Sequence, residues 1–280
     1  MAEQQTIRHP AMAGRFYPGS RDRLANVVDT YFSEPVAAQQ PAINPKILIV
    51  PHAGYVYSGQ TAAVGFAQIQ AVSRIILLGG SHHRRFNGAA LYQGDFWKTP
   101  IGHAPIDQEA ISWLEQQPLF DIGNDVHQPE HCLEVQVPFL QQKLSHFGIV
   151  PILLSQASKD EINQMARVLV EIMDDDTLLV ISSDLSHYPP QDDAKRIDQA
   201  VIEAILSLDI DRLAITINQQ MNSGVDNLST CACAETAIKV GMQAAHLLGA
   251  TDVTLLRYTN SGQISGDPAR VVGYATIAFC

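Results

Sequence analysis

The chain has 280 residues, of which 46% are hydrophobic and 17% charged, and its formal net charge is −11. This composition is that of a globular protein with enough chain to bury a large core, and its acidity argues against a nucleic-acid partner. We see no apolar stretch of the roughly 20 residues that span a bilayer and no secretory signal. The 4 cysteines form no CxxC pair, so we expect a reduced, cytoplasmic protein.

Short apolar segments alternate with amphipathic ones after an N-terminal segment, residues 1–20, that we expect to be irregular. The patterns predict strands at 46–51, 74–78, 89–92, 149–154, 177–183, 253–258 and 270–279. They predict helices at 21–32, from 58 or 59 to 72, and at 108–117, 133–146, 159–173, 191–206, 210–220 and 233–248. A linker is expected at 35–42. This order predicts one three-layer α/β domain over residues 1–280, with a mixed, mainly parallel central sheet between helices.

Histidines follow three of the expected strands. His52 comes after the strand at 46–51, His82 and His83 after the strand at 74–78, and His187 after the strand at 177–183. The carboxyl ends of strands in open α/β sheets line the ligand crevice, and imidazole is a good ligand for iron, copper or zinc. The sequence therefore predicts a transition-metal site at this edge. Since His82 and His83 are adjacent, we expect at most one of them to be a ligand.

Asp184 and His187 are three residues apart. If the chain turns helically there, the carboxylate and the imidazole lie on one side and suit proton transfer. The alternative is that Asp184 caps a helix and His187 is exposed. The apolar run after His131 is expected to be buried, which would place this histidine where it could line a pocket. Glu130 and Glu134 are as compatible with a solvated position as with a structural one.

Cys231 and Cys233 precede an alanine-rich helix. Backbone N–H groups at a helix N-terminus lower the pKa of a thiol, and thiolate is a strong metal ligand. A pair of small buried residues is the commoner role of cysteine. Because two sulfurs in a C-x-C pair point in different directions, we expect one functional sulfur at most.

Several motifs together resemble those of the Memo (mediator of cell motility) family. They are PHAGYVYSG at 51–59, LGGSHH at 78–83, EHCLEVQVPFL at 130–140, SSDLSH at 182–187 and GYA at 273–275. The resemblance runs in order over nearly the whole chain. Memo proteins are similar in fold to class III extradiol ring-cleaving dioxygenases, which use non-haem Fe(II). Prokaryotic members are often grouped with AMMECR-type and radical-SAM proteins, which the resemblance implies as partners.

The resemblance also implies roles for particular residues. It implies that His52, His82 and Cys233 are the metal ligands, that His187 and Asp184 form the acid/base pair, and that His131 lines the cleft. Cys233-Ala-Glu-Thr-Ala-Ile fits the family pattern Cys-Gly-x-x-Pro-Ile best, but its two alanines depart from that pattern and leave Cys231 open. Related dioxygenases have a carboxylate where this family has cysteine, so dioxygenase activity does not follow from the fold.

Three functions remain open on this basis. The first is metal-dependent oxidation of a small organic substrate, with Fe(II) or alternatively copper as cofactor. The second is a non-enzymatic binding or adaptor protein whose vestigial dioxygenase cleft holds a peptide or small ligand. The third is a zinc-dependent hydrolase, since zinc accepts two imidazoles, a thiolate and a water.

Overall fold

The computed structural model describes residues 5–34, 37 and 43–280, so the first four residues and most of the expected linker at 35–42 lie outside the described residues. The helices are α1 (Arg21–Ser33), α3 (Tyr55–Ala67), α4 (Gln108–Leu114), α5 (Asn124–His127), the 3₁₀ turn η1 (Glu134–Gln136), α6 (Val137–Lys143), α7 (Lys159–Glu171), α8 (Gln191–Leu206), α9 (Ile210–Met221), α10 (Glu235–Leu247) and α11 (Ser261–Ser265). The strands are β1 (Ile7–Arg8), β2 (Ile47–Val50), β3 (Arg74–Gly80), β4 (Ala89–Leu91), β5 (Phe96–Lys98), β6 (His103–Pro105), β7 (Phe120–Ile122), β8 (Gly148–Leu154), β9 (Thr177–Ser182), β10 (Val253–Asn260) and β11 (Gly273–Phe279).

The main sheet has eight strands in the order β10-β11-β2-β9-β3-β8-β4-β7. Its centre, β2-β9-β3-β8, is parallel, whereas β10, β11 and β4 introduce antiparallel pairs. Ser182 at the end of β9 pairs with Val50 on one side and Gly79 on the other. The register therefore brings the carboxyl ends of β2, β9 and β3 to one place on the sheet edge.

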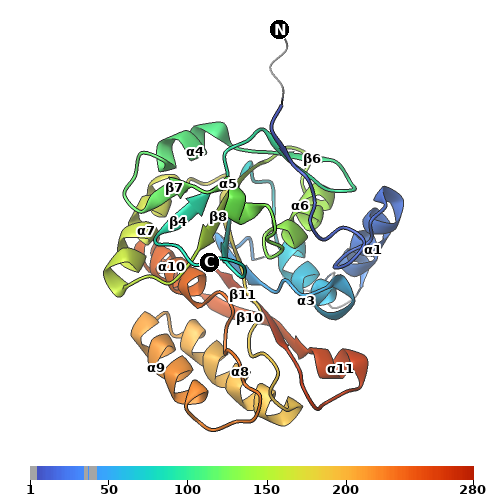
Figure 1. Ribbon diagram of the computed structural model, residues 1–280, viewed down its shortest axis with the longest axis vertical. Helices are drawn as coiled ribbons and strands as arrows, with labels where there is room; N and C mark the ends of the chain where they lie inside the picture. The colour runs from blue at the N-terminus through green and yellow to red at the C-terminus, as the bar shows by residue number, and fades with distance from the viewer. Residues whose placement is uncertain (1–4, 35–36, 38–42) are drawn as a thin grey trace.

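Helices cover both faces of this sheet (Figure 1). Alternate side chains of β2 point to opposite faces, and the strand is fully buried. Gly65 of α3 packs against Leu48 and Val50, whereas Gly241 of α10 packs against Ile47 from the other side. Burying each aliphatic side chain of this core contributes roughly 1.5–3 kcal/mol. The expected mixed, mainly parallel sheet flanked by helices is confirmed.

The elements that the sequence analysis missed are short. β1, β5 and β6 form a separate three-stranded sheet in which β1 runs parallel to β5, far along the chain. β7 adds a three-residue edge strand to the main sheet. Strands of two or three residues are too short to show an alternating pattern, and their partners are distant in sequence. The expected helix at 133–146 begins as the turn η1 and continues as α6, with Pro138 in its first turn.

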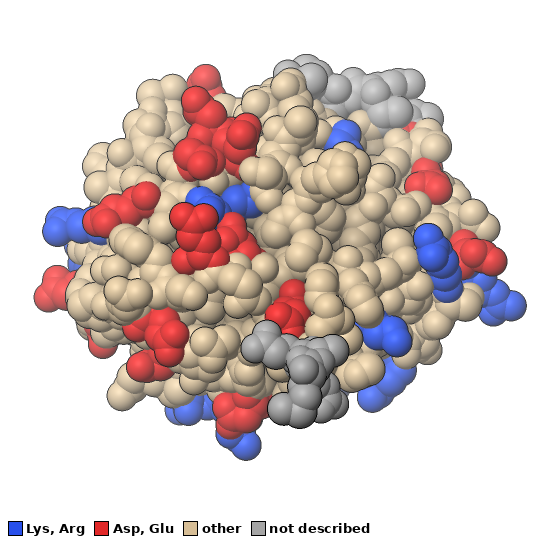
Figure 2. Space-filling model, turned by 90° about the horizontal axis from the view of Figure 1, so that it is seen from above, with Lys and Arg blue, Asp and Glu red and all other residues tan. Residues whose placement is uncertain are grey.

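Within the described ranges, no helix combines the length and the apolar character needed to cross a bilayer. On the face of the molecule in Figure 2, acidic and basic side chains are interspersed among uncharged residues.

Candidate metal centre

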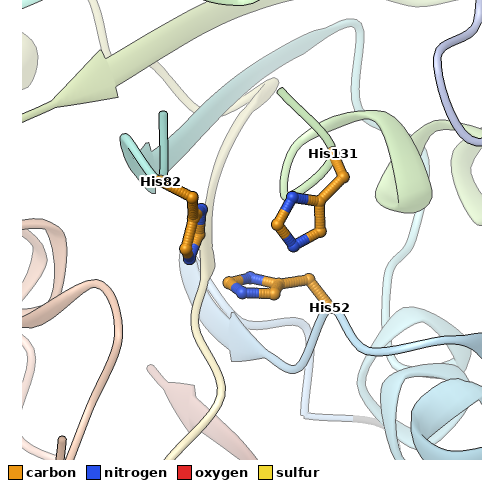
Figure 3. A group of neighbouring side chains, drawn as sticks. All are labelled: His52, His82 and His131. Atoms are coloured by element: carbon orange, nitrogen blue, oxygen red, sulfur yellow. The ribbon is translucent and has the colours of Figure 1, made fainter. Parts of the chain in front are cut away.

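Three histidines meet at the carboxyl edge of the sheet (Figure 3). His52 follows β2, His82 follows β3, and His131 lies in the loop before η1. One ring nitrogen from each lies within 4.8 Å of the others. The ring centroids of His82 and His131 are 4.7 Å apart, and His52 is 5.1 Å from His82 and 5.3 Å from His131. His83, as expected, is outside this group.

A hydroxyl group fixes the tautomer of His52. Ser182 Oγ donates its only hydrogen to the carbonyl oxygen of Cys132 at 2.6 Å and accepts a hydrogen bond from Gln136 Nε2 at 2.8 Å. His52 Nδ1 lies 3.0 Å from the same oxygen. Because Ser182 has no second hydrogen to give, Nδ1 of His52 must be the donor. Its Nε2 therefore keeps a lone pair, which faces the other imidazoles.

A buried carboxylate fixes the other two histidines. Glu130, 2% exposed, lies 3.1 Å from His82 Nδ1 and 2.9 Å from His131 Nδ1. It also accepts hydrogen bonds from the backbone N–H groups of His82 and His131, each at 2.8 Å. Burial works against ionisation of Glu130, but the hydrogen bonds from His131 and His82 outweigh it and hold its pKa well below the usual range. An ionised carboxylate only accepts, so both Nδ1 atoms donate, which leaves Nε2 as the nitrogen of each ring that can bind a metal.

The donor set fits a transition metal. Burial and the neighbouring imidazoles lower the pKa of His52 well below its ordinary value, so this imidazole is neutral, the form that binds metal. His52, His82 and His131 each present Nε2 to the same space and fix Nδ1 by a second hydrogen bond. This arrangement of outer hydrogen bonds is typical of histidine ligands in metalloproteins.

Cys233 lies beside His52 rather than within the group of three imidazoles. Its Sγ is 3.2 Å from His52 Nε2 and accepts a hydrogen bond from the backbone N–H of Asp184 at 3.2 Å. Burial raises the pKa of the Cys233 thiol, against the lowering expected from a helix N-terminus. α10 begins only at Glu235, two residues later, and desolvation outweighs the helix. Cys231 is fully buried, and its thiol makes no hydrogen bond to a histidine in the described part of the chain.

Gly80 allows the cysteine loop to approach the end of β3. A Cβ at this position would lie 2.9 Å from the carbonyl oxygen of Cys233 and 3.2 Å from Ala234 Cα. We expect Gly80→Ala to displace this loop and lower the free energy of unfolding by about 1–3 kcal/mol, which urea titration would measure. Gly102→Ala is the control, because a Cβ there meets nothing within 4 Å. Equal stability of the two variants would contradict this account.

Asp184 supports His52 instead of His187. Its Oδ1 accepts a hydrogen bond from the backbone N–H of His52 at 2.8 Å, and burial raises its pKa to about 6. No hydrogen bond joins Asp184 to His187 in the described residues, so the expected orientation of His187 by this carboxylate is not observed. Backbone pairing with Thr230 and Val272 holds His187 in place. Its buried Nε2 has no partner among the described residues, and burial lowers its pKa to about 4.

The sequence analysis missed Asp198 of α8, which supports the loop before His187. Asp198 is fully buried and accepts hydrogen bonds from Ser186 N at 2.9 Å and from Tyr258 Oη at 2.8 Å. Its position on the buried face of α8, between Ile197 and Val201, could have indicated a buried carboxylate from the sequence. An acidic residue on the apolar stripe of a helix needs a buried polar partner.

Asp198 makes the stability of the protein depend on pH. Burial raises its pKa from 3.8 to about 6, so between these values the folded state binds more protons than the unfolded state. Its contribution to stability is complete below pH 4 and is lost as the pH rises to 6, by roughly 2–3 kcal/mol. In urea titrations at several pH values, Asp198→Asn should lack this loss, whereas the exposed control Asp226→Asn should keep it. Parallel pH profiles of Asp198→Asn and wild type would refute the assignment.

Arg8 and Glu134, fully buried and 2.7 Å apart, hold the histidine loop against the N-terminal segment. Arg8 also donates to the carbonyl oxygens of His127 at 2.9 Å and Glu130 at 2.6 Å. Glu134 accepts further hydrogen bonds from the backbone of Ala11 and from the hydroxyl of Tyr17. Glu134 is thus structural, whereas Glu130 holds two histidines of the centre. Nothing in the sequence pattern around Arg8 indicates this contact.

Comparison with known proteins agrees with this architecture. A family model described as "Memo-like protein" matches residues 8–278. A MEMO1 family protein of Aquifex aeolicus is 35% identical over 276 residues, which cover 98% of this chain and 99% of the relative. Another, from Thermoplasma volcanium, is 33% identical and covers 98% of both chains.

One solved structure shares the fold. It is the uncharacterized protein JW3007 from Escherichia coli K12, which superposes with a TM-score of 0.53 at 12% sequence identity and covers 82% of this chain and 98% of that chain. This likeness concerns the fold, whereas the sequence matches extend over nearly the whole chain. The chain therefore belongs to the Memo-like protein family.

Proposed function

We propose that the centre binds Fe(II) and that the protein catalyses metal-dependent oxidation of a small organic substrate. The observation that supports the proposal most is the convergence of three imidazoles, from His52, His82 and His131, at one edge of the sheet, each with Nδ1 held by a hydrogen bond. Cys233 Sγ, 3.2 Å from His52 Nε2, is placed to serve as a further ligand. Iron held by such nitrogen and sulfur donors would supply one-electron chemistry and positions for a substrate.

The surrounding residues have separate tasks in this proposal. His187 is neutral at pH 7, because burial lowers its pKa to about 4, and its Nε2 is free to accept a proton. Ser182 and Glu130 hold the imidazoles in the tautomer that binds metal. Asp184 positions two neighbours: its carboxylate accepts a hydrogen bond from the backbone N–H of His52, and its own backbone N–H donates to the sulfur of Cys233.

Anaerobic Fe(II) titration tests the binding step. We expect His52→Ala to bind iron at least about 100-fold more weakly than wild type, because it removes a ligand that the fold positions. The exposed His103, replaced by Ala, is the control. His131→Ala and Cys233→Ser, titrated in parallel, show which of the two residues completes the site. Equally weak binding by wild type and His52→Ala would end the proposal.

Oxygen uptake with catechol-like compounds tests the oxidation step separately. The iron-loaded wild type should consume oxygen, and His187→Gln should lower the rate by about 10²–10⁴-fold while leaving iron affinity unchanged, as expected for loss of a general base. Iron binding without substrate-dependent oxygen uptake would overturn the oxidation step alone.

A zinc-dependent hydrolase is the second candidate, because three histidines are also a ligand set of catalytic zinc sites. The metal content of protein purified without chelators or nickel resin distinguishes the two. Iron in stoichiometric amount supports oxidation, and zinc supports hydrolysis.

A further inference from the structure

A cavity of about 260 Å³ opens beside Cys233. Its walls come from the end of β3, the loop after β8 and the start of α10. The residues that line it include Gly80, Arg85, Ser155, Gln156, Cys233 and Glu235. Since Cys233 also contacts His52, one end of this cavity lies next to the metal centre.

A second hollow, of about 390 Å³, continues the first. Arg85, Ser155 and Gln156 line both, and Phe86 and Asn87 complete the outer one. Together the two hollows form a groove, which we call the Arg85 groove, that leads from Cys233 outward. A small organic molecule with its reactive end at the metal centre would extend along it.

The charges in the Arg85 groove favour an anion. The neighbouring Arg84 is already paired with Asp125. Glu235, the carboxylate of the lining, is paired with Lys239. Within the residues that the structure describes, no carboxylate lies within 4.0 Å of the Arg85 guanidinium. The groove thus holds a free guanidinium in a chain of net charge −11.

Polar side chains next to Arg85 are also available. Ser155 and Gln156 line both hollows, and neither side chain makes a hydrogen bond to another described residue. A hydroxyl and an amide can each donate a hydrogen bond to an oxyanion. A guanidinium binds the paired oxygens of a carboxylate or phosphate by two parallel hydrogen bonds.

We propose that the Arg85 groove binds the anionic group of the substrate, a carboxylate or a phosphate, and directs the rest of the molecule toward Cys233 and the three histidines. The substrate class is therefore a small organic acid or organic phosphate. This inference rests on the proposed function in treating the bound anion as a substrate, but the binding of the anion itself needs no metal.

The first test uses full-length, metal-free protein and ¹⁹F NMR at constant ionic strength. The probes are 4-fluorobenzoate and 4-fluorophenyl phosphate, with 4-fluorobenzamide as the neutral probe of similar shape. We expect Arg85→Gln to weaken the binding of the preferred anion by about tenfold, as for a lost charge-assisted hydrogen bond, and to leave the amide unchanged. Arg84→Gln is the matched control and should stay within about twofold of wild type. The two anions distinguish carboxylate from phosphate.

A second measurement locates the anion in the groove through the Cys233 thiol. Iodoacetate is an anion and iodoacetamide is neutral, and mass spectrometry measures alkylation of Cys233 by each. Arg85→Gln should slow iodoacetate relative to iodoacetamide by several-fold, as loss of electrostatic attraction predicts. Arg84→Gln should leave the ratio of the two alkylation rates unchanged. Cys132 and Cys231, both fully buried, are internal references.

Three outcomes would overturn the inference. They are anions that bind wild type no more tightly than the amide, equal effects of Arg84→Gln and Arg85→Gln, and an unchanged ratio of alkylation rates in Arg85→Gln. If the metal-free protein binds the anion through Arg85 but the loaded protein oxidises nothing, the proposed oxidation fails while the anion site stands.

Discussion

Replacing Glu130 with Gln is expected to weaken metal binding by about 10–100-fold, because this carboxylate orients two of the three histidines. Both Nδ1 atoms, of His82 and His131, approach one Glu130 oxygen, at 3.1 and 2.9 Å, and the backbone N–H of His82 donates to the other oxygen at 2.8 Å. A Gln that keeps its carbonyl oxygen on the two imidazoles turns its N–H groups toward that backbone N–H, and its uncharged oxygen is a weaker acceptor for the imidazoles. Titration with Zn²⁺ or anaerobic Fe(II), followed by calorimetry, measures the affinity.

The same replacement should lower the free energy of unfolding by about 2–3 kcal/mol, because it leaves buried donors without an acceptor. Glu134→Gln is the matched control, since Glu134 is a buried carboxylate of the same segment that accepts several hydrogen bonds but touches no histidine of the centre. Glu134→Gln should reduce stability and leave metal affinity nearly unchanged. Equal losses of affinity in both variants would show that Glu130 acts only through folding.

The contribution of Glu130 to stability should depend on pH in the opposite sense to that of Asp198. Its pKa in the folded protein is depressed, so the folded state binds fewer protons than the unfolded state at acid pH. The stabilisation is therefore complete above the ordinary pKa of Glu and is lost as the pH falls below about 4. The stability difference between wild type and Glu130→Gln should shrink below pH 4.

Replacing Arg8 with Met is expected to lower the free energy of unfolding by about 3–5 kcal/mol, the largest stability effect that we predict. Arg8 and Glu134 are fully buried, and removal of the guanidinium leaves the carboxylate without a counter-charge. Met keeps much of the apolar contact with Trp97, whose ring lies 4.3 Å from the guanidinium carbon. The loss would therefore come mainly from the unpaired charge. Urea denaturation followed by circular dichroism measures it.

A double variant tests whether the ion pair causes the loss. Arg8→Met combined with Glu134→Gln removes both charges, and it should be more stable than Arg8→Met alone because no buried charge remains uncompensated. If the stability losses of the two single variants simply add in the double variant, the ion pair is not the cause of the loss in Arg8→Met. The double variant should also keep its CD spectrum, since the strands and helices do not depend on this pair.

Part of the candidate site could be predicted from the sequence because it depends on local patterns. Apolar runs predict buried strands, parallel strands end at the same edge, and His52 and His82 each follow such a strand by two residues. The fold class followed in the same way from the alternation of strands and helices. The positions of these two histidines therefore needed no knowledge of distant contacts.

The role of Asp184 could not be predicted in this way. The spacing of three residues between Asp184 and His187 suggested a pair, but the chain continues as extended backbone that pairs His187 with Thr230. The Asp184 carboxylate instead reaches His52, which is 132 residues away in the chain. Spacing predicts which side chains share a face only when the local backbone conformation is known.

The sequence by itself determined the layers of this protein and the edge at which His52 and His82 lie, because strand and helix patterns are short-range and their packing follows general rules. Only the tertiary structure decided that His131 joins them, that Glu130 and Ser182 set the tautomers, and that Arg8 supports the loop from 126 residues away. The physical reason is that a buried polar group takes whichever partner the packed chain brings within hydrogen-bonding distance, and no local pattern records that partner.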